Sequence, residues 1–173
     1  AGFWFLDRLA ETAGLSFRRS LRLHSQVAKG ALWGHDCVLA RPRTYMNESG
    51  RAVRAVMNYY KSRPEQVLVA YDELDLPPGT VRLKKGGGHG GHNGMRDIFR
   101  HTPDTGFLRL RLGIGHPGHK SAVTGYVLGR PGAEDERLIL GSIGDALDVM
   151  PTLLGGDLPA AMKQLHTEKP DGI

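Results

Sequence analysis

The residues whose types and spacing suit chemistry lie in the central stretch 71–94. Three carboxylates, Asp72, Glu73 and Asp75, directly follow the apolar, strand-like run 67–70. A carboxylate at the end of a buried strand can orient a histidine and stabilise its charged form, which makes Asp72 a candidate partner for a general base. Carboxylates also suit Mg²⁺, but no second carboxylate cluster or histidine pair at ligand spacing supports a metal site, so no metal or cofactor is expected.

A glycine-rich loop follows these carboxylates. Six glycines lie within 86–94, interrupted by His89, His92 and Asn93. Glycine at this density disfavours a helix or strand and favours a loop whose backbone comes close to a ligand. The loop does not end in Gly-Lys-Ser/Thr and does not follow a first strand, so it is neither a Walker A loop nor a dinucleotide fingerprint. A nucleotide-binding module is therefore disfavoured.

Covalent catalysis has no support either, because the chain lacks a Gly-x-Ser-x-Gly elbow and Cys37 has no sequence context of a nucleophile. What remains is attack by water, assisted by a base and by the amide side chains of Asn47 and Asn93, which can donate hydrogen bonds to a carbonyl or a developing oxyanion. From spacing alone, Asn47 is more simply interpreted as a helix cap, with Ser49 as the other candidate cap. Lys84 and the arginines of the stretch 107–114 can hold phosphates nearby.

The elements that must position these residues follow from hydrophobic periodicity, which predicts an α/β fold. We expect helices at 3–10, 51–60, 94–100, 134–150 and 157–166, and strands at 22–28, 36–41, 67–71, 80–84 and 107–114. In the last of these strands apolar and basic side chains alternate, so we expect one face to be wet and positively charged.

The totals set limits on the class of protein. A chain of 173 residues is most simply one domain. A single cysteine suits a reducing compartment, no apolar run approaches the ~20 residues of a membrane span, and no signal peptide opens the chain, so a cytoplasmic protein is expected. The net charge of +5 favours polyanion partners such as nucleic acid, although solubility is the simpler explanation of charge alone.

Four motifs, in this order, resemble bacterial peptidyl-tRNA hydrolase; they span 44–50, 72–79, 84–94 and 109–117. The resemblance covers nearly the whole chain. It implies one α/β domain over 1–173, with a twisted mixed β-sheet flanked by helices. It also implies a monomer that hydrolyses the ester between a peptide and the 3′ ribose of tRNA without a metal, which recycles tRNA after premature release from the ribosome. Its partner would be peptidyl-tRNA, not a membrane.

The resemblance assigns catalytic roles to particular residues. The acidic partner of the catalytic histidine falls on Asp72, and the amides that hold the substrate fall on Asn47 and Asn93. His92 matches a histidine beside the site that is not the principal base. Two further pairs have binding roles: residues that line the same cleft, Tyr45 and Met46, and the basic pair that clamps the tRNA 5′ phosphate, Lys84 and Arg111.

The sequence departs from the family at its start. The family's general base is a histidine in an Arg-His-Asn-Ala-Gly run after the first strand, and this chain begins at the Ala-Gly of that run. We therefore expect the first strand and the catalytic histidine to be missing from 1–173, and the chain by itself to be inactive unless His92 replaces the base. The alternative function is a non-catalytic RNA-binding member of the same fold, such as those resembling organellar splicing factors. The retained Asp72, Asn47 and Asn93 argue against it, because a pure binder does not need an acid aimed at a base.

Overall fold

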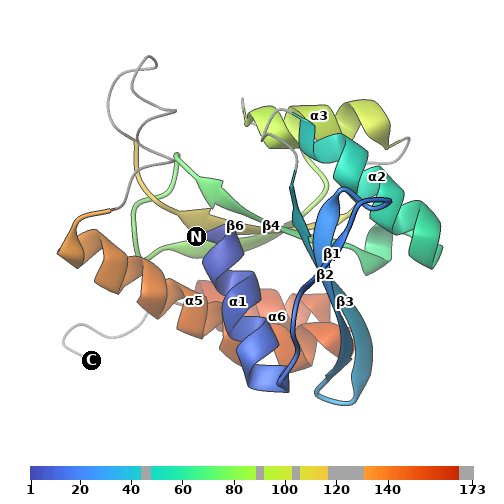
Figure 1. Ribbon diagram of the computed structural model, residues 1–173. Helices are drawn as coiled ribbons and strands as arrows, with labels where there is room; N and C mark the ends of the chain where they lie inside the picture. The colour runs from blue at the N-terminus through green and yellow to red at the C-terminus, as the bar shows by residue number, and fades with distance from the viewer. Residues whose placement is uncertain (44–47, 89–91, 103–105, 117–130, 168–173) are drawn as a thin grey trace. The chain divides into compact units, whose positions relative to one another are not determined.

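The computed structural model of the chain describes residues 1–43, 48–88, 92–102, 106–116 and 131–167 (Figure 1). Within these residues helices and strands are interspersed along the chain, and two three-stranded sheets form, with strand orders β1-β2-β3 and β4-β6-β5. The predicted α/β class is confirmed, with the strands divided between two sheets.

The elements have these bounds: α1 Gly2–Ala13, β1 Arg18–Ser20, β2 Ser25–Leu32, β3 His35–Pro42, α2 Ser49–Tyr60, η2 Pro64–Gln66, β4 Leu68–Glu73, β5 Val81–Lys85, α3 Asn93–His101, β6 Leu108–Gly113, α5 Ala133–Leu154 and α6 Leu158–His166. The residues group into two compact units. The first unit comprises Ala1–Phe5, Ala70–Leu83 and Leu110–Ile173, and the second comprises Leu6–Val69 and Lys84–Arg109.

In the first unit, α5 and α6 lie side by side (Figure 1). The buried residues of α5 recur at helical spacing, as the sequence predicted, and include Ile139, Ile143, Ala146, Val149, Met150 and Leu153. The helix extends to Leu154, beyond the predicted end, with Pro151 inside its last turn. The helix α6 begins after Asp157, whose carboxylate accepts a hydrogen bond from the backbone nitrogen of Ala160 at 3.1 Å.

In the second unit, β1, β2 and β3 form an antiparallel sheet. Trp33 and Gly34 connect β2 to β3 with positive φ values of 47° and 80°, the backbone sign of a two-residue hairpin turn. The predicted strands at 22–28 and 36–41 correspond to β2 and β3, but β2 begins only at Ser25. His24 takes a φ of 50°, which belongs to a turn, and the short β1 was not predicted.

The helices α2 and α3 of the second unit also lie side by side (Figure 1). Gly50 permits this approach, because a Cβ atom there would clash with the backbone carbonyl of Asp97. The carboxylate of Asp97 accepts a hydrogen bond from the Gly50 backbone nitrogen at 2.7 Å, in a buried position. This bond satisfies one of the backbone donors that every helix leaves open in its first turn.

Two local predictions need correction. The N-cap of α2 is Glu48, without a side-chain capping bond, and Ser49 is already helical; the other candidate cap, Asn47, lies outside the described residues. The basic face of β6 is not wet at Arg109, whose exposed fraction is 2%. The prediction failed because alternation along a strand shows which side chains share a face, not what covers that face.

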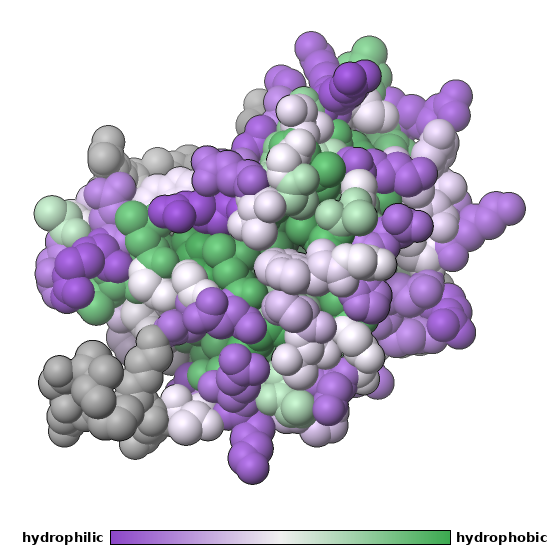
Figure 2. Space-filling view, turned by 90° about the horizontal axis from the view of Figure 1, so that it is seen from below, coloured by the Kyte–Doolittle hydropathy of each residue, from purple (hydrophilic) through white to green (hydrophobic). Residues whose placement is uncertain are grey.

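Among the described residues, no helix is long and apolar enough to cross a membrane. The face of the surface shown in Figure 2 is mixed, with hydrophilic side chains in purple standing among hydrophobic ones in green.

Candidate active site

Asp72 lies near the end of β4, where the sequence placed the acid. Its Oδ1 atom accepts a hydrogen bond from the Gly2 backbone nitrogen at 2.8 Å and lies 2.8 Å from the amino nitrogen of Ala1. Within the described part of the chain, the Oδ2 atom accepts no hydrogen bond, and the side chain keeps 20% of its surface exposed. One oxygen of this carboxylate is therefore held by backbone N–H at the start of α1, while the other can bind a further donor.

Gly2 makes this arrangement possible. It opens α1, and a Cβ atom at this position would lie 2.8 Å from the carbonyl oxygen of Ala70 on β4. Glycine therefore allows the start of the helix to approach the strand closely enough for its amide to reach Asp72. The N-terminus of a helix also carries a partial positive charge, which stabilises an ionised carboxylate placed against it.

Glu73, the neighbour of Asp72, pairs with an arginine and does not serve the Mg²⁺ site that its sequence position could also suggest. Its Oε1 atom accepts hydrogen bonds from Nε and Nη2 of Arg111, each at 2.8 Å, and both side chains are largely buried. The pair joins the adjacent strands β4 and β6. Arg111 therefore shares its charge with Glu73, and sequence reasoning missed this partner because 38 residues separate the two.

His92 is the N-cap of α3, and its ring atom Nδ1 accepts a hydrogen bond from the Met95 backbone nitrogen at 3.1 Å. A neutral imidazole that accepts at Nδ1 carries its proton on Nε2, so this ring can donate from Nε2 but cannot accept a proton there. Asn93 follows as the first residue of the helix and is exposed. The helix predicted at 94–100 is confirmed, beginning one residue earlier.

Arg109 holds the described start of the glycine-rich loop. Its guanidinium donates hydrogen bonds to the carbonyl oxygens of Gly87 and Gly88 and lies over the Phe99 ring, 5.1 Å from the ring centroid. Gly86 and Gly87 take positive φ values of 68° and 91°, which glycine adopts without strain. The position of Arg109 in an alternating strand predicted a contact with phosphate, whereas its donors bind the backbone of the loop.

Lys84 lies beside the same loop. A Cβ atom on Gly87 would come within 2.8 Å of the Lys84 Nζ atom, so the lysine side chain extends along the loop backbone. Lys84 is itself exposed at the end of β5, which leaves its charge accessible to a phosphate.

The predicted site residues thus fall into three groups. Asp72 and Arg111 belong to the first unit, on neighbouring strands, and Lys84, His92 and Asn93 flank the glycine-rich loop in the second. A third group lies outside the described residues: Tyr45, Met46 and Asn47. Within the described ranges, no three His, Cys, Asp or Glu side chains come together in a way that could hold a metal ion.

These features define an α/β protein with an acid fixed at a strand end and a glycine-rich loop leading into a helix, suited to hydrolysis assisted by a base. Comparison with known proteins supplies the family. A family model described as peptidyl-tRNA hydrolase matches residues 1–172, and the chain belongs to this family.

Individual relatives agree with this assignment. The peptidyl-tRNA hydrolase of Stenotrophomonas maltophilia strain K279a is 51% identical over 169 residues, covering 98% of this chain and 88% of the relative. That of Halorhodospira halophila is 49% identical, covering 96% and 86%. The crystal structure of peptidyl-tRNA hydrolase from Acinetobacter baumannii is 45% identical, with a TM-score of 0.92 over 97% of this chain and 85% of that one.

Proposed function

We propose that this protein hydrolyses the ester bond between the peptide and the 3′ ribose of tRNA in peptidyl-tRNA, and so recycles tRNA after premature release from the ribosome. The family supports this activity. The observation that carries the mechanism is the half-occupied carboxylate of Asp72, whose Oδ1 is held by N–H groups. An imidazole that donates to Oδ2 would be fixed in one tautomer and stabilised when charged.

In the proposed reaction, this imidazole takes a proton from water while the water oxygen attacks the ester carbonyl. The resulting oxyanion accepts hydrogen bonds from the amides of Asn47 and Asn93. The bond from the carbonyl carbon to the ribose oxygen then breaks, and the ribose oxygen takes the proton from the imidazolium. The products are tRNA with a free 3′ hydroxyl and a peptide carboxylic acid, which ionises to the carboxylate by releasing its proton to water.

We propose that the base is a histidine outside residues 1–173 and not His92, and we expect residues 1–173 alone to be inactive. His92 is the less suitable base, since its Nδ1 caps α3 and its Nε2 carries the proton. We give His92 the role of an acceptor that caps the start of this helix and so positions Asn93.

For tRNA, we propose that exposed Lys84 contacts a phosphate directly and that Arg111 contributes the charge that Glu73 does not neutralise. Tyr45 and Met46 are proposed to line the cleft that holds the substrate. We further propose that residues 1–173 belong to one domain of a cytoplasmic monomer. The relatives named above are hydrolases by name, and nothing among them favours the non-catalytic alternative.

The test is Asp72→Asn in the chain extended upstream through the preceding residues, compared with the extended wild type and with 1–173. Asparagine keeps the size of the side chain but lacks the charge that stabilises the imidazolium, so we expect kcat to fall by ~10⁴-fold or less while tRNA binding is kept. Unchanged kcat at saturating peptidyl-tRNA would refute the role of Asp72. Full activity of 1–173 would refute the assignment of the base upstream.

A further inference from the structure

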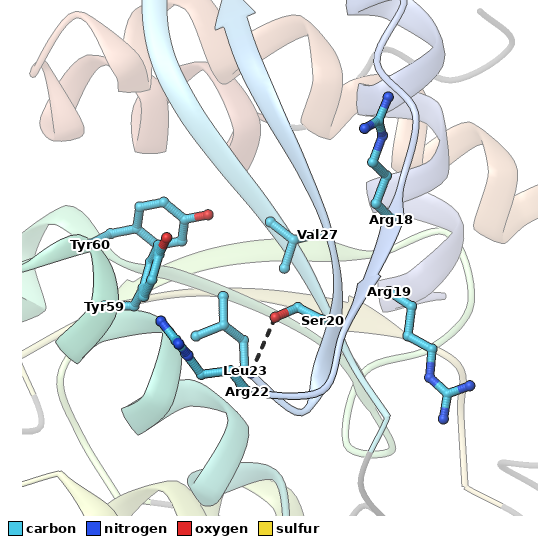
Figure 3. Close-up of a pocket in the computed structure, with 8 residues that line it drawn as sticks. All are labelled: Arg18, Arg19, Ser20, Arg22, Leu23, Val27, Tyr59 and Tyr60. Atoms are coloured by element: carbon cyan, nitrogen blue, oxygen red, sulfur yellow. Dashed lines mark hydrogen bonds between the residues drawn. The ribbon is translucent and has the colours of Figure 1, made fainter.

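A hollow lies in the second unit, lined by β1, the turn after it, β2 and the end of α2 (Figure 3). Its volume is about 330 Å³, at the lower end of the ~300–1,000 Å³ of pockets that take small ligands. The residues that line this Arg/Tyr pocket are Arg18, Arg19, Ser20, Arg22, Leu23, Val27, Tyr59 and Tyr60. None of them is among the candidate active-site residues.

The pocket combines aromatic and apolar surface with cations. Figure 3 shows Leu23 and Val27 between the two tyrosines on one side and Arg18 and Arg19 on the other. The Tyr59 ring packs edge-on against Tyr60, with centroids 4.8 Å apart, yet 53% of Tyr59 stays exposed. Exposed aromatic surface beside an apolar floor is the kind of platform on which a nucleic-acid base stacks.

The charge of the pocket has no internal counterpart. Within the described part of the chain, Arg18, Arg19 and Arg22 have no carboxylate at ion-pair distance. Among the other arginines of the described ranges, four pair with a carboxylate, as follows: Arg41 with Asp7, Arg63 with Glu65, Arg111 with Glu73 and Arg137 with Glu134. The rest have no such partner within those ranges, so what distinguishes the pocket is the aromatic and apolar surface beside its cation. Figure 3 shows Arg22 beside the tyrosines, whereas Arg18 and Arg19 lie beyond Leu23 and Val27, and Arg19 extends away from the rings. Arg22 is therefore the cation placed to bind a phosphate next to the rings, because a guanidinium group binds phosphate with several donors at once.

The aromatic rings are themselves held by cations. The Arg22 guanidinium lies 6.0 Å from the centroid of the Tyr59 ring, and the Lys29 ammonium lies 5.8 Å from that of Tyr60. These contacts bring positive charge to the edge of the stacking surface, so a base on the ring and its phosphate on the cation can be bound together.

We propose that the Arg/Tyr pocket is a second RNA-binding site, which takes an unstacked nucleotide with its base against Tyr59 and its phosphate on Arg22. The proposal rests on the proposed function in one respect, since it takes a tRNA as the natural occupant. An acidic protein segment would engage the guanidinium groups equally well but would not need the exposed ring.

The test measures binding of deacylated tRNA and of a short single-stranded RNA over a range of salt concentrations. Because Tyr59→Ala removes the ring on which a base would stack, it should weaken binding of the short RNA by roughly 5- to 150-fold, while Tyr59→Phe should bind like the wild type. Arg22→Ala should lower the salt slope by about 0.7 to 0.9, as expected for one lost phosphate contact. The matched controls are Trp33→Ala, an exposed aromatic on the β2–β3 turn, and Arg63→Ala, an exposed arginine paired with Glu65; both should bind like the wild type.

Thermal unfolding of each variant shows whether the fold is kept, and Tyr59→Leu, which keeps apolar bulk but lacks the ring, serves as the readout of stacking if Tyr59→Ala unfolds. Equal effects of the pocket variants and their controls would overturn the proposal. A second result would also overturn it: Arg22→Ala weakens RNA binding, Tyr59→Ala does not, and heparin competes fully with the RNA. The pocket would then be a charged surface or a site for an acidic protein.

Hydrolysis separates the two proposals. For peptidyl-tRNA, the pocket variants should raise KM and leave kcat unchanged, and a peptidyl ester of a single nucleoside should be hydrolysed at the wild-type rate. Tyr59-dependent RNA binding by a protein without hydrolytic activity would uphold the RNA site and sink the proposed function. Normal hydrolysis of peptidyl-tRNA, with pocket variants that change neither KM nor RNA binding, would uphold the proposed function and refute the RNA site.

Discussion

Replacement of Asp97 by alanine tests how the start of α2, two residues beyond Asn47 in the sequence, is held in place. Asp97 is buried on α3, and its Oδ2 accepts a hydrogen bond from the Gly50 backbone nitrogen at 2.7 Å. The same oxygen lies 3.6 Å from Nδ1 of His101, a half-exposed ring. Alanine removes the acceptor and leaves the Gly50 N–H group buried without it.

The magnitude follows from the bond to Gly50. A hydrogen bond to a charged group contributes ~1.5–3 kcal/mol to stability, and a buried donor left unpaired costs ~1–3 kcal/mol. The two figures describe largely the same loss, so they are not added. The contact with His101 adds little, because that ring is partly exposed to solvent. We therefore expect Asp97→Ala to lower the free energy of unfolding by about 2–3 kcal/mol. A change of this size shifts the Tm of a chain of this length by roughly 4–12 °C.

Urea unfolding followed by far-UV circular dichroism measures this change, and peptide release from tRNA measures its effect on the site. Asp97→Asn keeps an oxygen acceptor and should lose less than half as much stability. Asp148→Ala is the matched control, because Asp148 is exposed on α5 and its replacement should change stability by less than ~0.5 kcal/mol. A loss below ~1 kcal/mol for Asp97→Ala, or equal losses for Asp97 and Asp148, would refute the reasoning.

Three further predictions concern other parts of the chain. Gly2→Ala places a Cβ 2.8 Å from the Ala70 carbonyl oxygen, so it should displace the start of α1, lowering Tm and, in the chain extended upstream, kcat; an alanine variant of that extended chain with wild-type kcat would contradict the close approach. Burial, aided by the nearby charge of Arg82, lowers the pKa of His166, whose Nε2 accepts a hydrogen bond from the Leu83 backbone nitrogen at 3.0 Å. The fold favours the neutral ring, so the contribution of His166 to folding stability is complete above the unfolded pKa of ~6.5 and is lost as the pH falls below that value. Denaturant unfolding from pH 7.5 to 5 should therefore show a smaller loss of stability for His166→Gln than for the wild type. Lys84→Ala should weaken tRNA binding and reduce its salt slope by about 0.9, whereas an equal effect on a small ester substrate would argue against a phosphate contact.

Much of the local structure could be predicted because short-range patterns determine it. The apolar spacing of 3–10 predicted α1, and Gly14, with a φ of 67°, follows its last residue Ala13. The strand that carries Asp72 and the helix that begins at Asn93 were likewise readable from apolar runs and their glycine and proline boundaries. The same residues, taken as ordered motifs, indicated the family before any fold was known.

The sequence by itself therefore predicted most of the elements, indicated the family and placed Asp72 near the end of a strand. Only the tertiary structure decided which charges pair and which are buried. Arg109 and Arg111 occupy equivalent positions in an alternating strand, yet one binds the carbonyls of Gly87 and Gly88 and the other binds Glu73. These partners lie 21 to 38 residues away in the chain, and the state of an ionisable group depends on the groups that surround it in space. Periodicity within one element contains no information about those neighbours.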